Sequence, residues 1–286
     1  MTSFRFIHTA DVHIDSPLIG LTRHEGSAAE RIRSATREAF DNLIGQAIDE
    51  QVAFVVIAGD LYDGDWRDFH TGLFFSLQMG RLAKAGIRAF ILYGNHDAES
   101  QITKRLSLPD NVNAFSSRKA ETFVLDEFKV ALHGQSFRQR DVTDNLVPGY
   151  PDPVPRMFNI GVLHTALGGE TGHENYAPCS LDELIAKGYD YWALGHVRNG
   201  QVLHEHPHIF DAAEIDPFQG NGLAHPALDR RALSGIEGQT GCPSRNRSNS
   251  ITRSRMRPSA INSCGILPAK ASSGLLSQCF SSGATT

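Results

Sequence analysis

Five short polar clusters in this chain follow directly after apolar runs, and each carries side chains that can bind a metal ion. The richest is Gly94-Asn95-His96-Asp97, which places an amide, an imidazole and a carboxylate after the apolar run 90–93. A single cluster of this kind is more often a helix cap or a satisfied polar group in a core. Five of them, each at the end of an apolar run, favour a metal site instead. The other four clusters carry Asp11 with His13, Asp60, His164 and His196.

The donor types in these clusters indicate which ions they would hold. Carboxylate, amide and imidazole ligands without a thiolate suit Mn²⁺, Fe²⁺ or Zn²⁺ better than Ca²⁺. A single tetrahedral ion has room for fewer ligands than the clusters offer, whereas two ions that share a carboxylate would use them all. Paired ions about 3.5–4 Å apart clamp the oxygens of an in-line displacement at phosphorus. The clusters therefore predict hydrolysis of a phosphate ester.

The stretches that precede the clusters have the composition of buried strands. Residues 4–10, 53–58 and 87–93 are short and largely apolar, and 53–58 has no polar residue, as expected for a strand buried on both faces. Asp11 and His13 lie two residues apart, so their side chains point to the same side of an extended backbone. Because the carboxyl ends of strands in an α/β sheet meet at one crevice, we expect the clusters to meet there.

Two helices are expected between these strands. Residues 28–50 and about 68–85 carry apolar residues at three- and four-residue spacing. The resulting alternation of strand and helix indicates an α/β fold, a sandwich with helices on the sheet faces. In the second helix the side chains expected to face the core are Phe69, Leu73, Phe74, Phe75, Leu77 and Leu82.

The second half of the chain predicts a mixed sheet. Residues 121–125 and 129–132 can form a hairpin, while 158–163, 189–194 and 201–209 have the composition of further strands. A hairpin beside strands that need crossovers gives a sheet with both strand directions.

Two connecting stretches are also identifiable. Residues 141–156 contain four prolines and are expected to form a loop. Ser180 and Glu183 form a capping-box sequence, which predicts a short helix that ends at Gly188.

The pattern changes after about residue 210. Residues 241–286 hold eleven serines and five clustered arginines but few apolar residues. Such a composition buries too little apolar surface to offset the entropy of ordering. We therefore expect a domain over 1–209 and a disordered tail over 210–286. Three explanations of the tail stay open: a flexible extension, a basic arm for nucleic acid, or translation out of frame.

Charge is distributed unevenly along the chain, whose formal net charge is −5. Residues 229–286 hold eight basic and two acidic residues, whereas the first 228 residues hold nineteen basic and thirty acidic ones. An acidic body is unlike that of a protein that grips nucleic acid through its phosphates. It does suit a site built from several carboxylates.

Nothing in the sequence indicates a membrane or secreted protein. No apolar stretch is long enough to cross a bilayer, and the N-terminus lacks the basic-then-apolar plan of a signal peptide. The four cysteines are scattered without a C-x-x-C pair, which indicates neither a zinc knuckle nor a disulfide framework. We expect a cytoplasmic, reduced protein.

As an ordered set, the clusters resemble the motifs of the calcineurin-like metallophosphoesterases. The set is D-x-H at Asp11 and His13, G-D at Asp60, G-N-H-D at 94–97, an isolated His164, and G-H at His196. The early D-x-H and the sequences around the motifs, HTADVHIDSPL and ALGH, resemble most closely the SbcD-type DNA double-strand-break repair exonucleases. The resemblance covers about residues 4–209 and implies a four-layer αββα fold.

The resemblance implies that this chain binds two divalent ions, with Mn²⁺ the expected metal. Asp11 and His13 would hold the first ion, and Asp60 would bridge both. The ligands of the second ion would be Asn95, His164 and His196.

The resemblance also implies catalytic residues and partners. His96 would face the scissile phosphate, where it would stabilise charge or protonate the leaving oxygen. Asp97 would orient His96 and keep it cationic. DNA would be the substrate, a coiled-coil ATPase the partner in repair, and a homodimer the assembly.

One position departs from the family's pattern. The family has a second histidine in G-H-x-H, whereas this chain has Arg198 there, and a guanidinium offers no lone pair to a metal. The first ion would keep Asp11, His13, Asp60 and water. A replacement ligand among His204, His206 and His208 is conceivable, although a solvated strand is the simpler interpretation.

Two alternatives to a DNA exonuclease therefore stay open. One is a phosphatase or small phosphodiesterase with the same dimetal core, because the chemistry at phosphorus is shared. The other is a truncated, catalytically impaired member of the family, which Arg198 and the unusual tail would favour.

Overall fold

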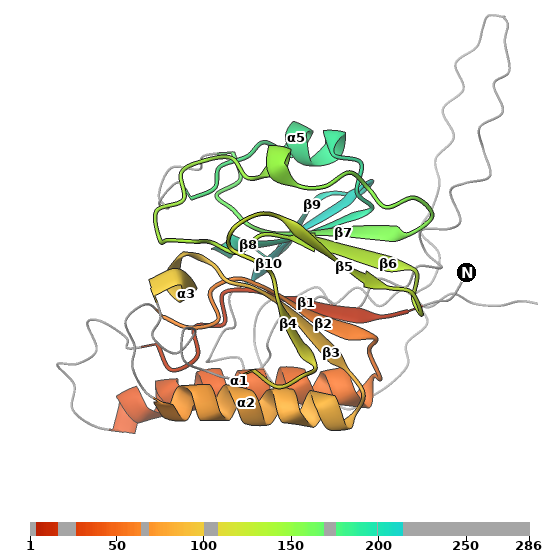
Figure 1. The fold of residues 1–286 in the computed structure, drawn as a ribbon. Helices are drawn as coiled ribbons and strands as arrows, with labels where there is room; N and C mark the ends of the chain where they lie inside the picture. Colours follow the sequence, from red (N-terminus) through yellow and green to blue (C-terminus); the bar gives the residue numbers. More distant parts are fainter. Residues whose placement is uncertain are drawn as a thin grey trace, which may run out of the picture. The chain divides into compact units, whose positions relative to one another are not determined.

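The computed structural model, drawn as a ribbon in Figure 1, describes residues 4–16, 27–63, 69–99, 108–168, 176–198 and 200–213. All of them lie within Met1–Gln239, the first of two units into which the chain divides. Two β-sheets pack face to face within this unit, and helices cover the outer face of each sheet. The predicted α/β class with αββα layers is therefore confirmed.

The first sheet is parallel throughout the described residues. Its strands lie in chain order: β1 (Phe6–Thr9), β2 (Phe54–Ala58), β3 (Arg88–Leu92) and β4 (Val112–Ala114). Parallel neighbours need a long crossover, because both strands run in the same direction. Two such crossovers are α1 (Ser27–Asp49) and α2 (Phe69–Lys84), which cover one face of the sheet. The carboxyl ends of β1, β2 and β3 consequently lie at one edge.

The second sheet is mixed, as predicted. Its order is β5-β6-β7-β8-β10-β9, with parallel strands in the middle and an antiparallel pair at each end. The strands are β5 (Glu121–Leu125), β6 (Val130–Gly134), β7 (Phe158–His164), β8 (Tyr191–Arg198), β9 (Gln201–His204) and β10 (His208–Ala213).

Three short helical elements complete the described part of the chain. They are α3 (Asn95–Glu99), the 3₁₀ helix η2 (Val147–Gly149) and α5 (Leu181–Ala186). Ser180 caps α5, and its hydroxyl accepts from the backbone N–H of Glu183 while the Glu183 side chain accepts from the backbone N–H of Ser180. The predicted capping box is therefore confirmed.

Strand β2 shows how the layers follow from the sequence. Val55 and Ile57 pack against α1 and α2, while Phe54 and Val56 pack in the cluster between the two sheets. Successive side chains of a strand point to opposite faces, so only a strand that is apolar on both faces fits this position. All five residues of β2 are buried. On the far side, Trp192 of β8 packs in the cluster beneath α5 and donates to the carbonyl of Leu184.

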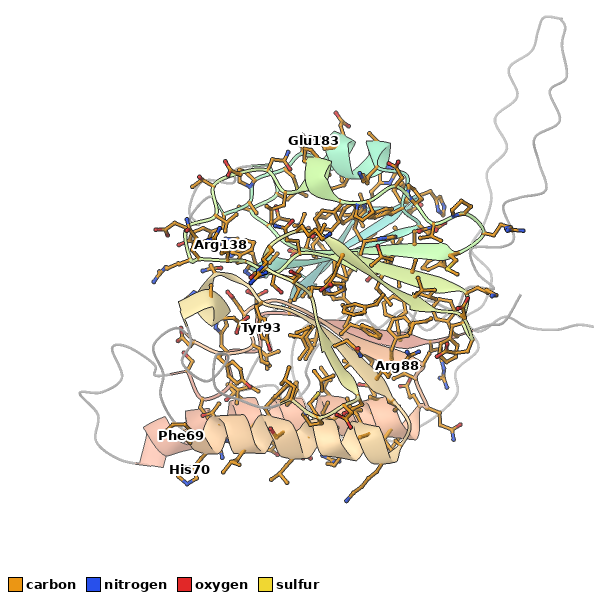
Figure 2. All side chains as sticks on the ribbon, viewed as in Figure 1. Phe69, His70, Arg88, Tyr93, Arg138 and Glu183 are labelled. Carbon is orange, nitrogen blue, oxygen red and sulfur yellow. The ribbon has the colours of Figure 1, made fainter. Side chains whose placement is uncertain are left out.

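The buried face of α2 differs in part from the prediction. Its buried apolar residues are Phe75, Met79 and Leu82. The prediction was wrong for Phe69, Leu73 and Leu77, which are 67%, 59% and 70% exposed, and Figure 2 labels Phe69 at the start of the helix. Both sets have helical spacing, so periodicity alone cannot select the face that meets the sheet.

No helix in the described residues is long and apolar enough to cross a membrane.

The predicted strand over 201–209 is in fact a hairpin. β9 and β10 pair antiparallel across the turn at 205–207, and β10 lies parallel beside β8. β10 continues to Ala213, four residues beyond the predicted domain boundary at 209. The rest of the predicted tail, from 214 onward, lies outside the described residues, so its predicted disorder stays a prediction.

Candidate metal centre

The structure places the predicted site residues at the carboxyl ends of five strands. Asp11 and His13 follow β1, and Asp60 follows β2. After β3, the α-helix α3 begins at Asn95 and includes His96. On the second sheet, β7 ends at His164 and β8 contains His196. The edges of both sheets therefore contribute to one site.

The described residues contain three candidate ligand groups, and two of them share Asp60; the third consists of His13, Asp63 and His96. Asp11, His13 and Asp60 offer atoms within 4.8 Å of one another, and so do Asp60, His164 and His196. Oδ2 of Asp60 lies 4.0 Å from Nε2 of His13 and 3.3 Å from Nε2 of His164. One carboxylate thus faces both groups, which is the arrangement that a bridging ligand requires.

The two oxygens of Asp60 have different surroundings. Oδ1 accepts from the backbone N–H of His96 at 3.1 Å, whereas Oδ2 is buried and faces Nε2 of His164, 3.3 Å away, without a hydrogen bond of good geometry among the described residues. A buried carboxylate oxygen without a donor is costly, and coordination of a cation removes that cost. Asn95 adds a further potential ligand atom, because its Oδ1 lies 3.0 Å from Nε2 of His164. The residues present fit two divalent ions.

The electrostatic surroundings of His164 also suit a bound cation. Its Nδ1 donates to the carbonyl of Ala58 at 3.0 Å, which directs Nε2 toward Asp60. Burial lowers the pKa of His164, but the nearby carboxylates of Asp60 and Asp11 raise it further, to about 9. Burial raises the pKa of Asp60, yet the histidines hold it well below its usual range. This environment favours positive charge between the two side chains.

Four of the nine non-glycine residues with a positive φ in the described part of the chain belong to this site. Asp11, His13, Asp60 and His196 have φ angles of 51°, 45°, 52° and 99°, a region that residues other than glycine seldom adopt. Hydrogen bonds hold the strain, since the N–H of Asp11 donates to the carbonyl of Gly59 and that of His13 to Asp60, both at 3.0 Å. Strained residues of this kind persist where the surrounding structure fixes them, and they cluster at functional sites.

Glycines in the motifs allow the strands to approach closely. A Cβ at Gly94 would lie 2.3 Å from Oδ1 of Asp60, and one at Gly59 would lie 2.3 Å from Nδ1 of His164. Gly59 also has a φ of 100°, where a side chain would be strained. The glycines of the G-D and G-N-H-D motifs are therefore needed for the site to close.

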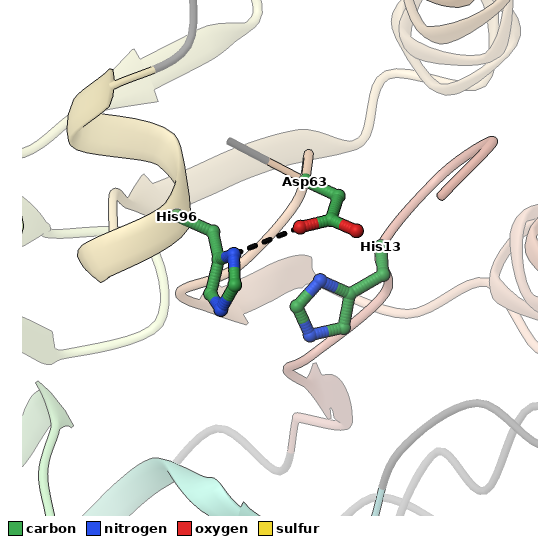
Figure 3. Close-up of side chains that lie close together, drawn as sticks. All are labelled: His13, Asp63 and His96. Carbon is green, nitrogen blue, oxygen red and sulfur yellow. Dashed lines mark ion pairs between the residues drawn. The ribbon is translucent and has the colours of Figure 1, made fainter. Parts of the chain in front are cut away.

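His96 is paired with an aspartate that the sequence analysis did not identify. Its Nδ1 lies 2.8 Å from Oδ1 of Asp63, and Figure 3 shows this ion pair beside His13. The hydrogen bond to Asp63 raises the pKa of His96, and it lowers the pKa of Asp63 to about 2. The hydroxyl of Ser16 donates to the other oxygen of Asp63. His96 is thereby oriented by Asp63 and favoured in its cationic form.

The predicted pairing of Asp97 with His96 is therefore wrong. Asp97 is completely buried and accepts from the backbone N–H groups of Leu61, Tyr62 and Gly94, at 3.1, 2.8 and 3.0 Å. Burial raises the pKa of Asp97 to about 7, although these donors favour the charged form. Adjacent residues of a helix point in different directions, so Asp97 holds the loop that carries Asp60 while His96 faces outward. The signal for Asp63 was its place three residues after Asp60.

Asp15 holds the loop after β1 in place. Both oxygens of Asp15 accept from the guanidinium of Arg37, at 2.7 and 2.5 Å, and the hydroxyl of Thr71 donates to it at 2.5 Å. This charge-assisted pair with two parallel bonds is among the stronger hydrogen-bonding arrangements in proteins. It ties the loop that carries His13 to α1 and α2.

Three predicted candidates for a replacement ligand lie elsewhere. His208 opens β10 opposite Tyr191, at the start of β8, while His196 is near the end of that strand. His204 and His206 belong to the same hairpin turn. These histidines therefore lie at one end of the strands, and the ligand groups lie at the other end. The side chain of Arg198 lies outside the described residues.

The chain is similar to known proteins in sequence and in fold. The family model described as calcineurin-like phosphoesterase matches residues 4–199. The chain is 36% identical to the uncharacterized metallophosphoesterase YhaO of Bacillus subtilis over 213 residues, which is 73% of this chain and 52% of that protein. It is 27% identical to the DNA double-strand break repair protein Mre11 of Methanopyrus kandleri over 214 residues, 68% of this chain and 44% of that protein.

The chain spans about half the length of these curated relatives. Among solved structures, a dimetal phosphatase from Danio rerio aligns with a TM-score of 0.46 at 12% identity, over 75% of this chain and 90% of that one. A Pseudomonas putida nuclease aligns with a TM-score of 0.29 at 14% identity, over 76% of this chain and 84% of that one.

Proposed function

The chain belongs to the calcineurin-like phosphoesterase family, and on that premise we propose that it is a metal-dependent phosphodiester hydrolase that acts as a DNA exonuclease. The observation that carries the hydrolase is Asp60, whose buried Oδ2 faces two groups of ligands at once. Family members use such a dimetal site. The DNA substrate has separate and weaker support, given below.

Each ligand has a specific task in this proposal. Asp11, His13 and Asp60 would hold the first ion, and Asp60, Asn95, His164 and His196 would hold the second. The bound ions would polarise the phosphoryl group and make water a better nucleophile. Mn²⁺ is the proposed metal, because oxygen and imidazole donors without thiolate suit it and the SbcD-type resemblance implies it.

His96 is the proposed general acid. Asp63 accepts the proton on Nδ1, so Nε2 of the cationic ring can donate to the leaving oxygen or to a phosphoryl oxygen. The ring of His96 lies 5.1 Å from that of His13, centroid to centroid, which places it beside the first ligand group. Asp63 acts through His96, and Asp97 acts through the loop of Asp60.

DNA is the proposed substrate because the relative from Methanopyrus kandleri is named DNA double-strand break repair protein Mre11. A phosphatase or small phosphodiesterase is the second candidate, since the same ligands would serve any phosphate ester. An impaired enzyme is the third, and its support is Arg198 at a position where the family has histidine.

The partners are proposals that rest on the family alone. A coiled-coil ATPase would act with this chain in repair, and a homodimer would be the assembly. Location in the cytoplasm also stays a prediction.

The test is hydrolysis of linear duplex DNA and of bis(p-nitrophenyl) phosphate in the presence of Mn²⁺. Asn95→Ala and His96→Ala should each lose most of the activity on DNA, roughly a hundredfold or more. His206→Ala is the matched control, because His206 is exposed at the opposite edge of the second sheet and should retain activity.

The outcomes separate the candidates. Hydrolysis of the small diester without degradation of DNA would favour the second candidate. Activity that appears only after Arg198→His would establish the impaired enzyme. No metal-dependent hydrolysis in either protein would contradict the proposed function.

A further inference from the structure

The loop that follows β6 packs beside the helix that carries His96. The N–H of Phe137 donates to the carbonyl of Tyr93 at 2.8 Å, and the hydroxyl of Ser136 accepts from the N–H of Tyr93 at 3.0 Å. Phe137 also packs in a cluster with Tyr176 and Ala98, the latter on α3. The loop therefore has a fixed place at the margin of the metal centre, and Figure 2 labels Arg138 on it near α3.

Arg140 lies on this loop, at the edge of the ligand groups. Its Nε donates to the phenol oxygen of Tyr176 at 3.3 Å. The ring of Tyr176 lies 5.6 Å from that of His196, centroid to centroid. The charge of Arg140 also lowers the pKa of His96, by less than the hydrogen bond to Asp63 raises it. The guanidinium is thus near His96 and His196 without belonging to either ligand group.

The chemistry of Arg140 suits a phosphate. A guanidinium binds phosphate oxygens through parallel N–H groups, and Tyr176 limits the conformations that the half-buried side chain can adopt. Anionic side chains surround the site, namely Asp11, Asp60 and Asp63. The two bound ions would offset these charges at the scissile phosphate, and a further cation at the margin would stabilise a second phosphate of the same strand.

We propose that Arg140, positioned by Tyr176, binds the phosphate next to the scissile one along a DNA strand and so makes the site prefer polynucleotides over small phosphodiesters. Under the proposed function the scissile phosphate would lie between the ligand groups and His96, and a cation at the margin would meet the neighbouring phosphate. The inference rests on the proposed function. It adds a specificity-determining residue to that function.

The test compares variants on two substrates with Mn²⁺. Arg140→Ala should lower kcat/KM on linear duplex DNA by roughly tenfold, mainly through KM, and leave kcat/KM on bis(p-nitrophenyl) phosphate within about twofold of the unchanged protein. Arg140→Lys keeps the positive charge but lacks the parallel N–H groups of the guanidinium, so it should recover part of the loss. Tyr176→Phe keeps the ring beside His196 but removes the hydroxyl, so it should show a smaller loss in the same direction. Arg138→Ala, on the same loop and exposed, is the matched control.

Salt dependence gives a second readout that a purely structural role would not change. A lost phosphate contact should make the slope of log KM for DNA against log salt shallower by about one unit in Arg140→Ala. Three results would overturn the inference: equal losses on both substrates, unchanged kcat/KM on DNA, or a wild-type protein that cleaves the small diester and never DNA. A wild-type protein without metal-dependent activity on either substrate would instead overturn the proposed function, and this inference with it.

Discussion

His164 and His133 are both completely buried, and each lies at the carboxyl end of a strand in the second sheet, on the neighbouring strands β7 and β6. The pKa of His164 is raised to about 9, because the carboxylates of Asp60 and Asp11 outweigh its burial. The pKa of His133 is lowered, because burial dominates. Two histidines with similar sequence surroundings thus have opposite electrostatic environments.

The partners of His133 are all neutral. Its Nδ1 accepts from the hydroxyl of Thr122 at 2.8 Å, and its Nε2 donates to Oδ1 of Asn159 at 3.0 Å. Its ring stacks on Tyr189 with centroids 4.4 Å apart. Both ring nitrogens are therefore hydrogen-bonded to the protein, and the imidazole serves the core of the outer layer.

The face of the strand accounts for the difference. In β7 the side chain of Val162 points into the cluster between the sheets, and His164 shares that face two residues later. In β6 Leu132 points inward, so His133 points outward, toward Tyr189. Only the inward face meets the loop after β2, where Asp60 lies. A buried histidine at a strand end becomes a ligand candidate when a carboxylate from the other sheet faces it.

The largest effect should come from Asp60, because it faces both ligand groups. Asp60→Asn keeps the shape of the side chain but removes its charge, and hydrolysis should fall by at least about a thousandfold. The measurement is kcat on DNA and on the small diester, with circular dichroism as the check on folding. Residual activity near that of the unchanged protein would show that the shared carboxylate is not part of the reaction.

His164→Gln and His133→Gln test the comparison directly. His164→Gln should weaken binding of the second metal ion by roughly a hundredfold or more, since it removes a nitrogen donor. His133→Gln should leave metal affinity unchanged and lower the free energy of unfolding, since it disturbs a buried hydrogen-bonded core. Isothermal titration with Mn²⁺ and urea unfolding measure the two effects. Equal loss of metal affinity in both variants would remove the distinction between the histidines.

Asp63→Asn and Asp97→Asn should separate a carboxylate that orients His96 from one that holds a loop. Asp63→Asn should lower kcat by roughly tenfold to a hundredfold, and more for alkyl leaving groups than for p-nitrophenol, which needs little protonation. Its effect on stability should be small. Asp97→Asn should lower the free energy of unfolding, because three backbone donors share two carboxyl oxygens and an amide offers one acceptor oxygen. A leaving-group dependence in Asp97→Asn and none in Asp63→Asn would reverse the assignment.

Much of the fold and of the candidate ligand set follows from the sequence. The apolar run of β2 predicts a strand buried on both faces, and parallel strands bring Asp11, Asp60 and Asn95 to one edge by their direction alone. His164 and His133 could not be separated in this way, because the face of a strand depends on which sheet covers it.

The hydrogen-bond partners of the site side chains were harder to predict than the positions of the candidate ligands. Asp97 follows His96 in the chain, but the helix α3 turns it toward the loop of Asp60, and Asp63 from another loop takes the place expected for it. α2 posed a similar problem, since it has one apolar stripe with Phe75 and another with Phe69. In each case the deciding contact comes from a segment distant in sequence, which local spacing does not encode.

The smallest expected effect concerns stability and pH. Because the pKa of His133 is lowered in the folded protein, the unfolded chain takes up this proton first as the pH falls below about 6.5. The contribution of His133 to the free energy of unfolding is therefore fully present above that pH and is lost below it. Urea unfolding between pH 5 and pH 8, compared with His133→Gln, measures this contribution, and the variant should show a weaker pH dependence over that range. An identical pH dependence in the two proteins would contradict the neutral assignment of His133.

The central claim is that Asp60 is shared by two metal ions, and Mn²⁺ binding tests it most directly. Equilibrium dialysis counts the bound ions, and electron paramagnetic resonance reports whether their spins are coupled through a common ligand. We predict two bound ions per chain with coupled spins, and loss of the coupling in Asp60→Asn. A single bound ion, or two ions whose spins are independent in the unchanged protein, would contradict the account.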